Sequence, residues 1–276
     1  MTAIIIPRRH HTQPQGRVRV AENNPYGEAA RFLINFGQGV DDIARGWSPE
    51  SGVANFGVGA LGRGLLADGV SAFVYRTNPV EIQYQATTLV VVSQSIEGGN
   101  NGYVLTRSMG SGTPSWGLGT HRGSLNGWTV AVNAGSDFIL SPHADIGAAA
   151  ASAPVCQVFS IGGGLARLTV NGQLAVSGAY TGSIDYSRTY QGQGIRILRE
   201  WAGGTTSFRG LVYACGVLEG ALSDAAAAEL SLNPWQLFRA DPIRIYSLPT
   251  GAISINSITA SNITQTGARI TLGLTR

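Results

Sequence analysis

Carboxylates are the first residues to test for chemistry, because two acids on one face of a strand can act as acid and base in the hydrolysis of a glycosidic bond. On a single strand such a pair is spaced two residues apart, since alternate side chains of a strand share a face, whereas acids from distant parts of the chain could still converge. Asp41 and Asp42 are adjacent and would point to opposite faces, and every other pair of acids is separated by at least five residues. A Gly-x-Ser-x-Gly nucleophile motif is also missing from the sequence. We therefore expect a protein that is not an enzyme.

Metal and cofactor motifs are equally poorly matched. Residues 57–62, GVGALG, fit a dinucleotide-binding fingerprint by letters alone. The residues that follow predict a turn and a strand, whereas the fingerprint requires a helix whose N-terminus receives the pyrophosphate. The histidines and cysteines show no metal-ligand spacing beyond one adjacent histidine pair: His10, His11, His121, His143, Cys156 and Cys215. We expect neither a cofactor nor a structural metal.

Sugar binding is the chemistry that the aromatic residues permit. A tryptophan ring can stack on a sugar, and nearby amides can bind its hydroxyl groups. The candidate rings are Trp116, Trp128 and Trp201, with Tyr103 and the polar residues Asn100, Asn101, His121 and Asn126 near them in sequence or in predicted loops. The alternative, which the frequency of buried aromatics favours, is that these rings form the core.

The basic charge is concentrated at the N-terminus. Arg8, Arg9, Arg17 and Arg19 precede the first acid, Glu22, so residues 1–21 carry +4 and the rest of the chain −1. With three prolines in its first 25 residues, this part predicts an extended anchoring arm over residues 1–28, and a solvated tail is the alternative. The remainder has no basic stripe interleaved with aromatics, so we expect no nucleic-acid partner.

No membrane or export signal is expected. The apolar run Ala3-Ile4-Ile5-Ile6 is too short for a signal peptide and precedes the arginines. No segment approaches the ~18 apolar residues of a membrane span. Cys156 and Cys215 fall in predicted strands, so we favour buried free thiols over a single inter-sheet disulfide.

The fold is indicated by residues 194–242, where the pattern changes from strand to helix. Two short apolar runs are separated by the turn-forming residues 202–205, as in an antiparallel pair. Ser223 and Asp224 then cap an alanine-rich segment that Asn233 and Pro234 end. From about residue 53 to 247, short strands alternate with turns, which predicts two packed antiparallel sheets and one short helix.

This segment resembles the end of a laminin-G-like, or concanavalin A-like, sandwich, in which a strand runs into a short helix of the type LSDAxxAxL. Residues 56–70, 88–92 and 102–105 resemble its earlier strands, and residues 166–175, with Asn171-Gly172 as the turn, resemble its LxLYVNGxL hairpin. The resemblance covers about residues 50–250 and implies an all-β jelly roll over residues 29–250. Some laminin-G-like domains bind calcium at loop acids; Asp137 and Asp185 are the only candidates, and solvated turn carboxylates are the favoured interpretation.

Residues 251–276 predict a separate extension. Two strands around polar turns, ITASNITQTGARITLGL, resemble the start of a fibronectin type III module. Two strands alone are marginal in water, so we expect them to pair with other subunits or with another protein; a frayed tail is the alternative.

The phrase NPWQLFRADP resembles the tail of laminin-G-like proteins encoded in bacteriophage and prophage genomes. This resemblance implies a non-enzymatic virion structural protein, such as a head fibre, decoration protein or tail-fibre component. Its expected partners are other virion proteins, bound through the arm, and further copies of the chain, with a homotrimer favoured. The protein would be made in the host cytoplasm. The alternative function is a lectin-like module for host-surface polysaccharide.

Overall fold

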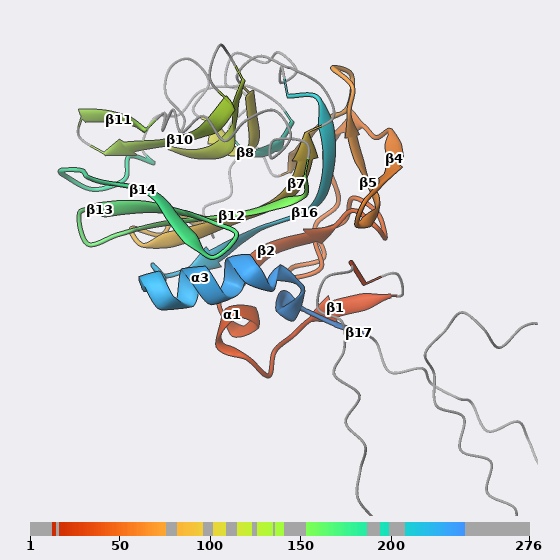
Figure 1. Ribbon diagram of the computed structural model, residues 1–276, viewed down its shortest axis with the longest axis horizontal. Coiled ribbons are helices and arrows are strands. Elements are labelled where there is room, and N and C mark those ends of the chain that lie inside the picture. Colours follow the sequence, from red (N-terminus) through yellow and green to blue (C-terminus); the bar gives the residue numbers. More distant parts are fainter. Residues whose placement is uncertain are drawn as a thin grey trace, which may run out of the picture. The chain divides into compact units, whose positions relative to one another are not determined.

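The computed structural model (Figure 1) describes residues 13–14, 17–75, 82–95, 102–108, 115–122, 126–134, 136–140, 153–186, 194–198 and 208–240. Their strands form two large sheets in which every pairing is antiparallel. The seven-stranded sheet has the order β11 (Ser136–Leu140), β10 (Asn126–Ala134), β9 (Trp116–Arg122), β8 (Gly102–Ser108), β15 (Gly194–Ile197), β6 (Ala72–Tyr75) and β3 (Ser51–Val53).

The eight-stranded sheet has the order β14 (Gln173–Ala179), β13 (Leu165–Val170), β12 (Val155–Gly162), β7 (Thr87–Ser95), β16 (Gly210–Glu219), β5 (Gly62–Ala67) and β4 (Phe56–Gly59). Its last strand, β2 (Ala30–Asn35), pairs with the second half of β16, whose first half pairs with β5. Layering of the two sheets is visible in Figure 1, with β8, β10 and β11 in one and β12, β13 and β16 in the other. The predicted all-β sandwich is confirmed.

Two apolar clusters hold the molecule together, one on each face of the eight-stranded sheet. Strand β7 shows how the sequence specifies both: Leu89 and Val91 belong to the core between the sheets, and Val90 and Val92 to the cluster on the outer face. A strand that packs against apolar clusters on both faces favours apolar side chains at successive positions, which explains the run LVVV at the centre of β7. Figure 1 shows the helix α3 (Asp224–Leu232) lying against this outer face.

The predicted helix and hairpin turn are both confirmed. The Ser223 hydroxyl oxygen accepts a hydrogen bond from the Ala226 N–H at 3.3 Å, and α3 ends at Leu232 with Asn233 as its C-cap. A 3₁₀ helix, η2 (Pro234–Leu237), follows. Asn171 and Gly172 both have positive φ, 45° and 86°, as a two-residue hairpin turn between β13 and β14 requires. None of the helices in the described ranges is long and apolar enough to cross a membrane.

Both cysteines are free and buried, as predicted. Cys215 of β16 belongs to the core between the sheets, and Cys156 of β12 to the cluster on the outer face. They therefore lie on opposite faces of one sheet. Burial raises the pKa of both thiols, so neither is a reactive thiolate at neutral pH.

The N-terminal segment departs from the expected extended arm. Strand β1 (Val18–Val20) pairs with β17 (Phe238–Ala240), and the short helix α1 (Pro25–Glu28) follows it. Residues 17–28 are thus part of the folded domain, because Val18 and Tyr26 contribute to the outer cluster. Arg8, Arg9 and the predicted strands of residues 251–276 lie outside the described residues.

Gln13 connects the segment before β1 to the centre of the eight-stranded sheet. Its side chain is buried, and its Nε2 donates to Asn35 Oδ1 at 2.6 Å and to the Tyr213 carbonyl at 3.0 Å. Tyr213 lies where the partner of β16 changes from β5 to β2. A Cβ at residue 37 would lie 2.7 Å from Gln13 Nε2, so glycine at 37 makes this approach possible.

Replacing Gln13 with alanine is expected to lower the free energy of unfolding by about 1–3 kcal/mol, because buried acceptors lose their donor. Urea denaturation measures the change. Gln173→Ala, at an exposed position of β14, is the matched control and should stay within about 0.5 kcal/mol of the wild type. Equal stability of the two variants would show that the hydrogen bonds of Gln13 do not stabilise the folded domain.

Candidate functional site

A glycine-rich loop, residues 36–47, follows β2 and is organised by one carboxylate. Asp42 Oδ1 accepts hydrogen bonds from the backbone N–H groups of Leu33 at 2.8 Å and Ala44 at 2.9 Å, and Oδ2 accepts from Arg45 N–H at 3.1 Å. The Ile43 N–H donates to the Leu33 carbonyl at 2.8 Å. Asp42 therefore fastens the loop along the edge of β2.

The environment of Asp42 indicates a structural role. Its side chain is buried, and burial raises the pKa of the carboxyl, although the three N–H donors and the charge of Arg45 act in the opposite direction. The neighbouring Asp41 is exposed and accepts a hydrogen bond from the Ser48 hydroxyl at 2.7 Å. The adjacent acids thus have different surroundings and do not act as a pair.

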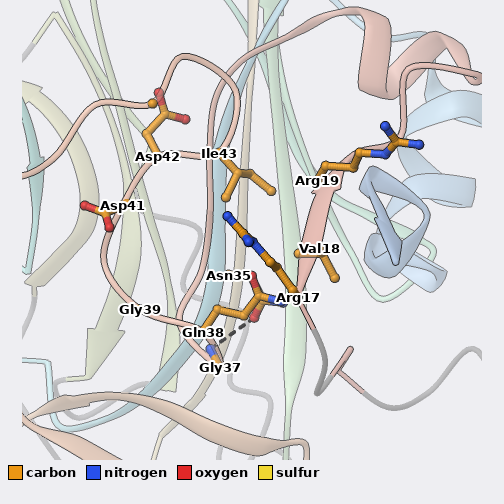
Figure 2. A pocket seen from close by; sticks show the side chains of 11 residues that line it. Arg17, Val18, Arg19, Asn35, Gly37, Gln38, Gly39, Asp41, Asp42 and Ile43 are labelled. Carbon is orange, nitrogen blue, oxygen red and sulfur yellow. Dashed lines mark hydrogen bonds between the residues drawn. The ribbon is translucent and has the colours of Figure 1, made fainter. Parts of the chain in front are cut away.

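A groove of about 620 Å³ lies between this loop and β1 (Figure 2). Arg17 extends across it toward Ile43, whereas Arg19 points away from Arg17. Guanidinium, amide and carboxylate groups therefore meet in one open hollow, together with backbone that glycines leave accessible. Its lining consists of Arg17, Val18, Arg19, Asn35, Gly37, Gln38, Gly39, Asp41, Asp42, Ile43 and Gly46.

The end of the same loop contributes to a second surface, which we call the aromatic ledge: Arg45, Trp47, Tyr84 and Tyr186. The three rings are half-buried and pack against the core, and Arg45 is exposed. The guanidinium carbon of Arg45 lies 5.2 Å from the centre of the Trp47 ring, and its Nη2 donates to the Tyr84 hydroxyl at 3.5 Å.

Tyr186 completes the ledge from a distant part of the chain. Its hydroxyl donates to the Tyr84 carbonyl at 2.7 Å. Burial raises the pKa of Tyr186 to about 12, so this hydroxyl keeps its proton at neutral pH. The ledge combines aromatic faces with a guanidinium group, an arrangement that can stack on a sugar ring and bind its hydroxyl groups.

The structure separates the residues predicted to bind glycan. Trp116 is fully buried in the core between the sheets, so its ring has no face exposed to a sugar, and here the core interpretation holds. Tyr103 is also buried. Trp128 lies in β10 opposite Thr120. Trp201, like Asn100 and Asn101, lies outside the described residues.

The other predicted sites are placed as follows. Of the arginines assigned to anchoring, Arg17 and Arg19 line the groove. Asp137 lies in β11 opposite Asn133 rather than in a loop, and the Asp185 carbonyl accepts a hydrogen bond from the Ser115 hydroxyl at 2.9 Å. The GVGALG motif forms the β4–β5 hairpin, which confirms that it is not a dinucleotide fingerprint. Within the described ranges no three acids, histidines or cysteines gather as metal ligands would.

Sequence reasoning missed the loop of residues 36–47 and the aromatic ledge. Three glycines around Asp41-Asp42 were the available signal for a tight loop, since an aspartate often bonds backbone N–H groups two or three residues on. No local pattern links Trp47 to Tyr84 or Tyr186.

Comparisons with known proteins identify the architecture. No protein-family model matches the chain, and no curated protein sequence does. Domain 4 of AbnA, a GH43 extracellular arabinanase from Geobacillus stearothermophilus solved in complex with arabinotriose, superposes with a TM-score of 0.55 at 13% identity, over 78% of this chain and 98% of that domain. The chain therefore has an antiparallel β-sandwich fold like that of this domain.

Two toxin domains share this sandwich. The binding domain of Paraclostridial Mosquitocidal Protein 1 has a TM-score of 0.55 at 9% identity over 74% of this chain, and that of botulinum neurotoxin serotype D/C has 0.53 at 13% identity over 74%. This chain spans about half of each of these two structures, 52% and 51%. At such identities the similarity establishes the fold alone.

Proposed function

We propose that this protein is a non-catalytic, lectin-like domain that binds carbohydrate through the groove and the aromatic ledge. The observation that carries the proposal is the loop of residues 36–47, which contributes polar groups to the groove and Trp47 to the ledge. Sugars are bound by this combination of an aromatic face and planar polar groups. The arabinotriose complex of the AbnA domain gives the same sandwich a sugar-binding precedent.

The absence of catalysis is part of the proposal. Asp42 is engaged by three backbone N–H groups, and Asp41 is the only other acid among the described residues that line the groove. A glycosidase needs a proton donor and a second carboxylate that both reach the scissile bond. The groove does not offer two such groups.

Glycan titration tests the proposal. We expect saturable binding of at least one member of a panel that contains arabinotriose and bacterial surface polysaccharides, measured by calorimetry. Trp47→Ala should weaken this binding about three- to tenfold, because the ring loses its stacking contact, and Arg17→Ala should also weaken it.

The matched control is Leu174→Ala, at an exposed apolar position of β14, the far edge of the eight-stranded sheet. It should bind as the wild type does. The proposal is wrong if the panel yields no saturable binding, or if Trp47→Ala and Arg17→Ala both bind as tightly as Leu174→Ala.

A virion role for this domain, with an anchoring N-terminus and a homotrimeric assembly, stays a prediction from the resemblance of NPWQLFRADP to phage-encoded proteins. Arg17 and Arg19, assigned to anchoring on that basis, have a second use as groove residues. A carbohydrate-binding domain can also be displayed on a particle, so the two roles are compatible.

A further inference from the structure

Arg107 is a cation in the wall of the apolar core. It lies in β8, opposite Trp116 of β9 and Ile195 of β15, both fully buried, and is itself only 1% exposed. Charged side chains are rarely buried this deeply unless a counter-charge and a full set of hydrogen bonds compensate for the lost hydration.

Only part of the guanidinium is satisfied. Nη1 donates to the Ser115 hydroxyl at 3.1 Å, and the guanidinium carbon lies 4.5 Å from the centre of the Tyr186 ring. Nε and Nη2 are buried, and neither has a hydrogen-bonding partner among the described residues. No carboxylate in the described part of the chain forms an ion pair with Arg107. Burial lowers the pKa of the guanidinium, the direction expected for a cation whose counter-charge is missing.

The two unsatisfied atoms define the chemistry of the missing partner. Nε and Nη2 form one edge of the guanidinium plane, the edge that binds both oxygens of a carboxylate side by side. Arg31 presents the same edge to the carboxylate of Glu219, although there Nε, at 2.8 Å, and Nη2, at 2.6 Å, both contact the single oxygen Oε2. We propose that the Nε–Nη2 edge of Arg107 binds the carboxylate of a ligand.

The position of this edge is fixed before a ligand arrives. Ser115 accepts from Arg107 and donates in turn to the Asp185 carbonyl at 2.9 Å, and Tyr186 covers one face of the guanidinium. Such preorganisation lowers the cost of binding. Because Tyr186 also belongs to the aromatic ledge, the carboxylate has two sources: a small free carboxylate or an acidic sugar bound at the ledge. The inference rests on Arg107 and does not require the groove to bind sugar.

Thermal unfolding at constant ionic strength tests the proposal. In one series chloride is replaced stepwise by acetate, and in a second series by glucuronate. Glucose is added in a third series as the uncharged comparison. The wild-type protein should gain about 2–4 °C in Tm in a saturable manner with at least one of the two carboxylates. Arg107→Met should show no gain, and Arg107→Lys, which keeps the charge but loses the paired donors, should need at least about tenfold more ligand. Stabilisation by acetate identifies a free carboxylate as sufficient, and stabilisation by glucuronate alone identifies the acidic sugar.

Arg196→Met is the matched control. Arg196 is a buried arginine on the neighbouring strand β15, and its variant should respond as the wild type does. The proposal is overturned if neither carboxylate stabilises the wild type, or if Arg107→Lys responds as the wild type does. Failure of the neutral glycans to bind, with carboxylate stabilisation intact, would instead reject only the proposed sugar site.

Discussion

Replacing Trp116 with alanine is expected to lower the free energy of unfolding by about 3–5 kcal/mol, because a fully buried indole leaves a large cavity in a close-packed core. Trp116 lies opposite Val132 of β10 and Arg107 of β8, within the cluster that joins the two sheets. The surrounding strands can therefore collapse into the space only in part. Urea denaturation of the wild type and the variant measures the loss.

Two further variants separate a core residue from a sugar platform. Trp116→Phe keeps an aromatic ring, so its loss in free energy of unfolding should be at most about half of the loss caused by Trp116→Ala. Trp47→Ala, on the half-buried ledge, should cost far less stability than Trp116→Ala while weakening glycan binding. If Trp116→Ala unfolded like the wild type but lost sugar binding, the assignment of Trp116 to the core would be wrong.

Asp42→Ala is expected to cost about 3–5 kcal/mol, because three backbone N–H groups lose their acceptor at a buried position. The loop of residues 36–47 would come away from the edge of β2, so the groove should also lose affinity for its ligand. Calorimetric unfolding and glycan titration of the same sample measure the two effects. Asp41→Ala is the control at the adjacent, exposed position, and it should leave stability within about 0.5 kcal/mol of the wild type.

Asp42→Asn adds a test of the charge. Since burial raises the pKa of Asp42 in the folded state, the folded protein holds this proton more tightly than the unfolded chain. The contribution of the carboxyl is then largest below its unfolded pKa and decreases as the pH rises through the folded value. The stability advantage of the wild type over Asp42→Asn should therefore be larger at acidic than at neutral pH. An advantage that grows with rising pH would contradict this assignment.

Elements with local signals could be predicted from the amino-acid sequence. A short alanine-rich helix was predicted after Ser223-Asp224 and before Asn233-Pro234, and the structure contains it as α3, with Ser223 as its N-cap. The β13–β14 turn followed from Asn171-Gly172, which adopt positive φ more easily than other pairs. The alternation of short apolar runs with turns was enough to predict the all-β sandwich. The spacing of the glycines in residues 57–62 was not enough to predict a nucleotide-binding site.

The location of the proposed site could not be predicted from the sequence, because the burial of a side chain depends on which strands pair. Residues 17–28 were expected to belong to an extended anchoring arm, yet β1 pairs with β17, more than two hundred residues later in the chain. Trp116 and Trp47 are the same residue type, yet the first is fully buried between the sheets and the second is only partly buried. Arg107 shows this most clearly, because the sequence around residue 107 does not indicate that Trp116 of β9 and Ile195 of β15 lie opposite it. A sequence pattern reports on contacts within a few residues, whereas the environment of a side chain in a sandwich is set by strands that the chain reaches only much later.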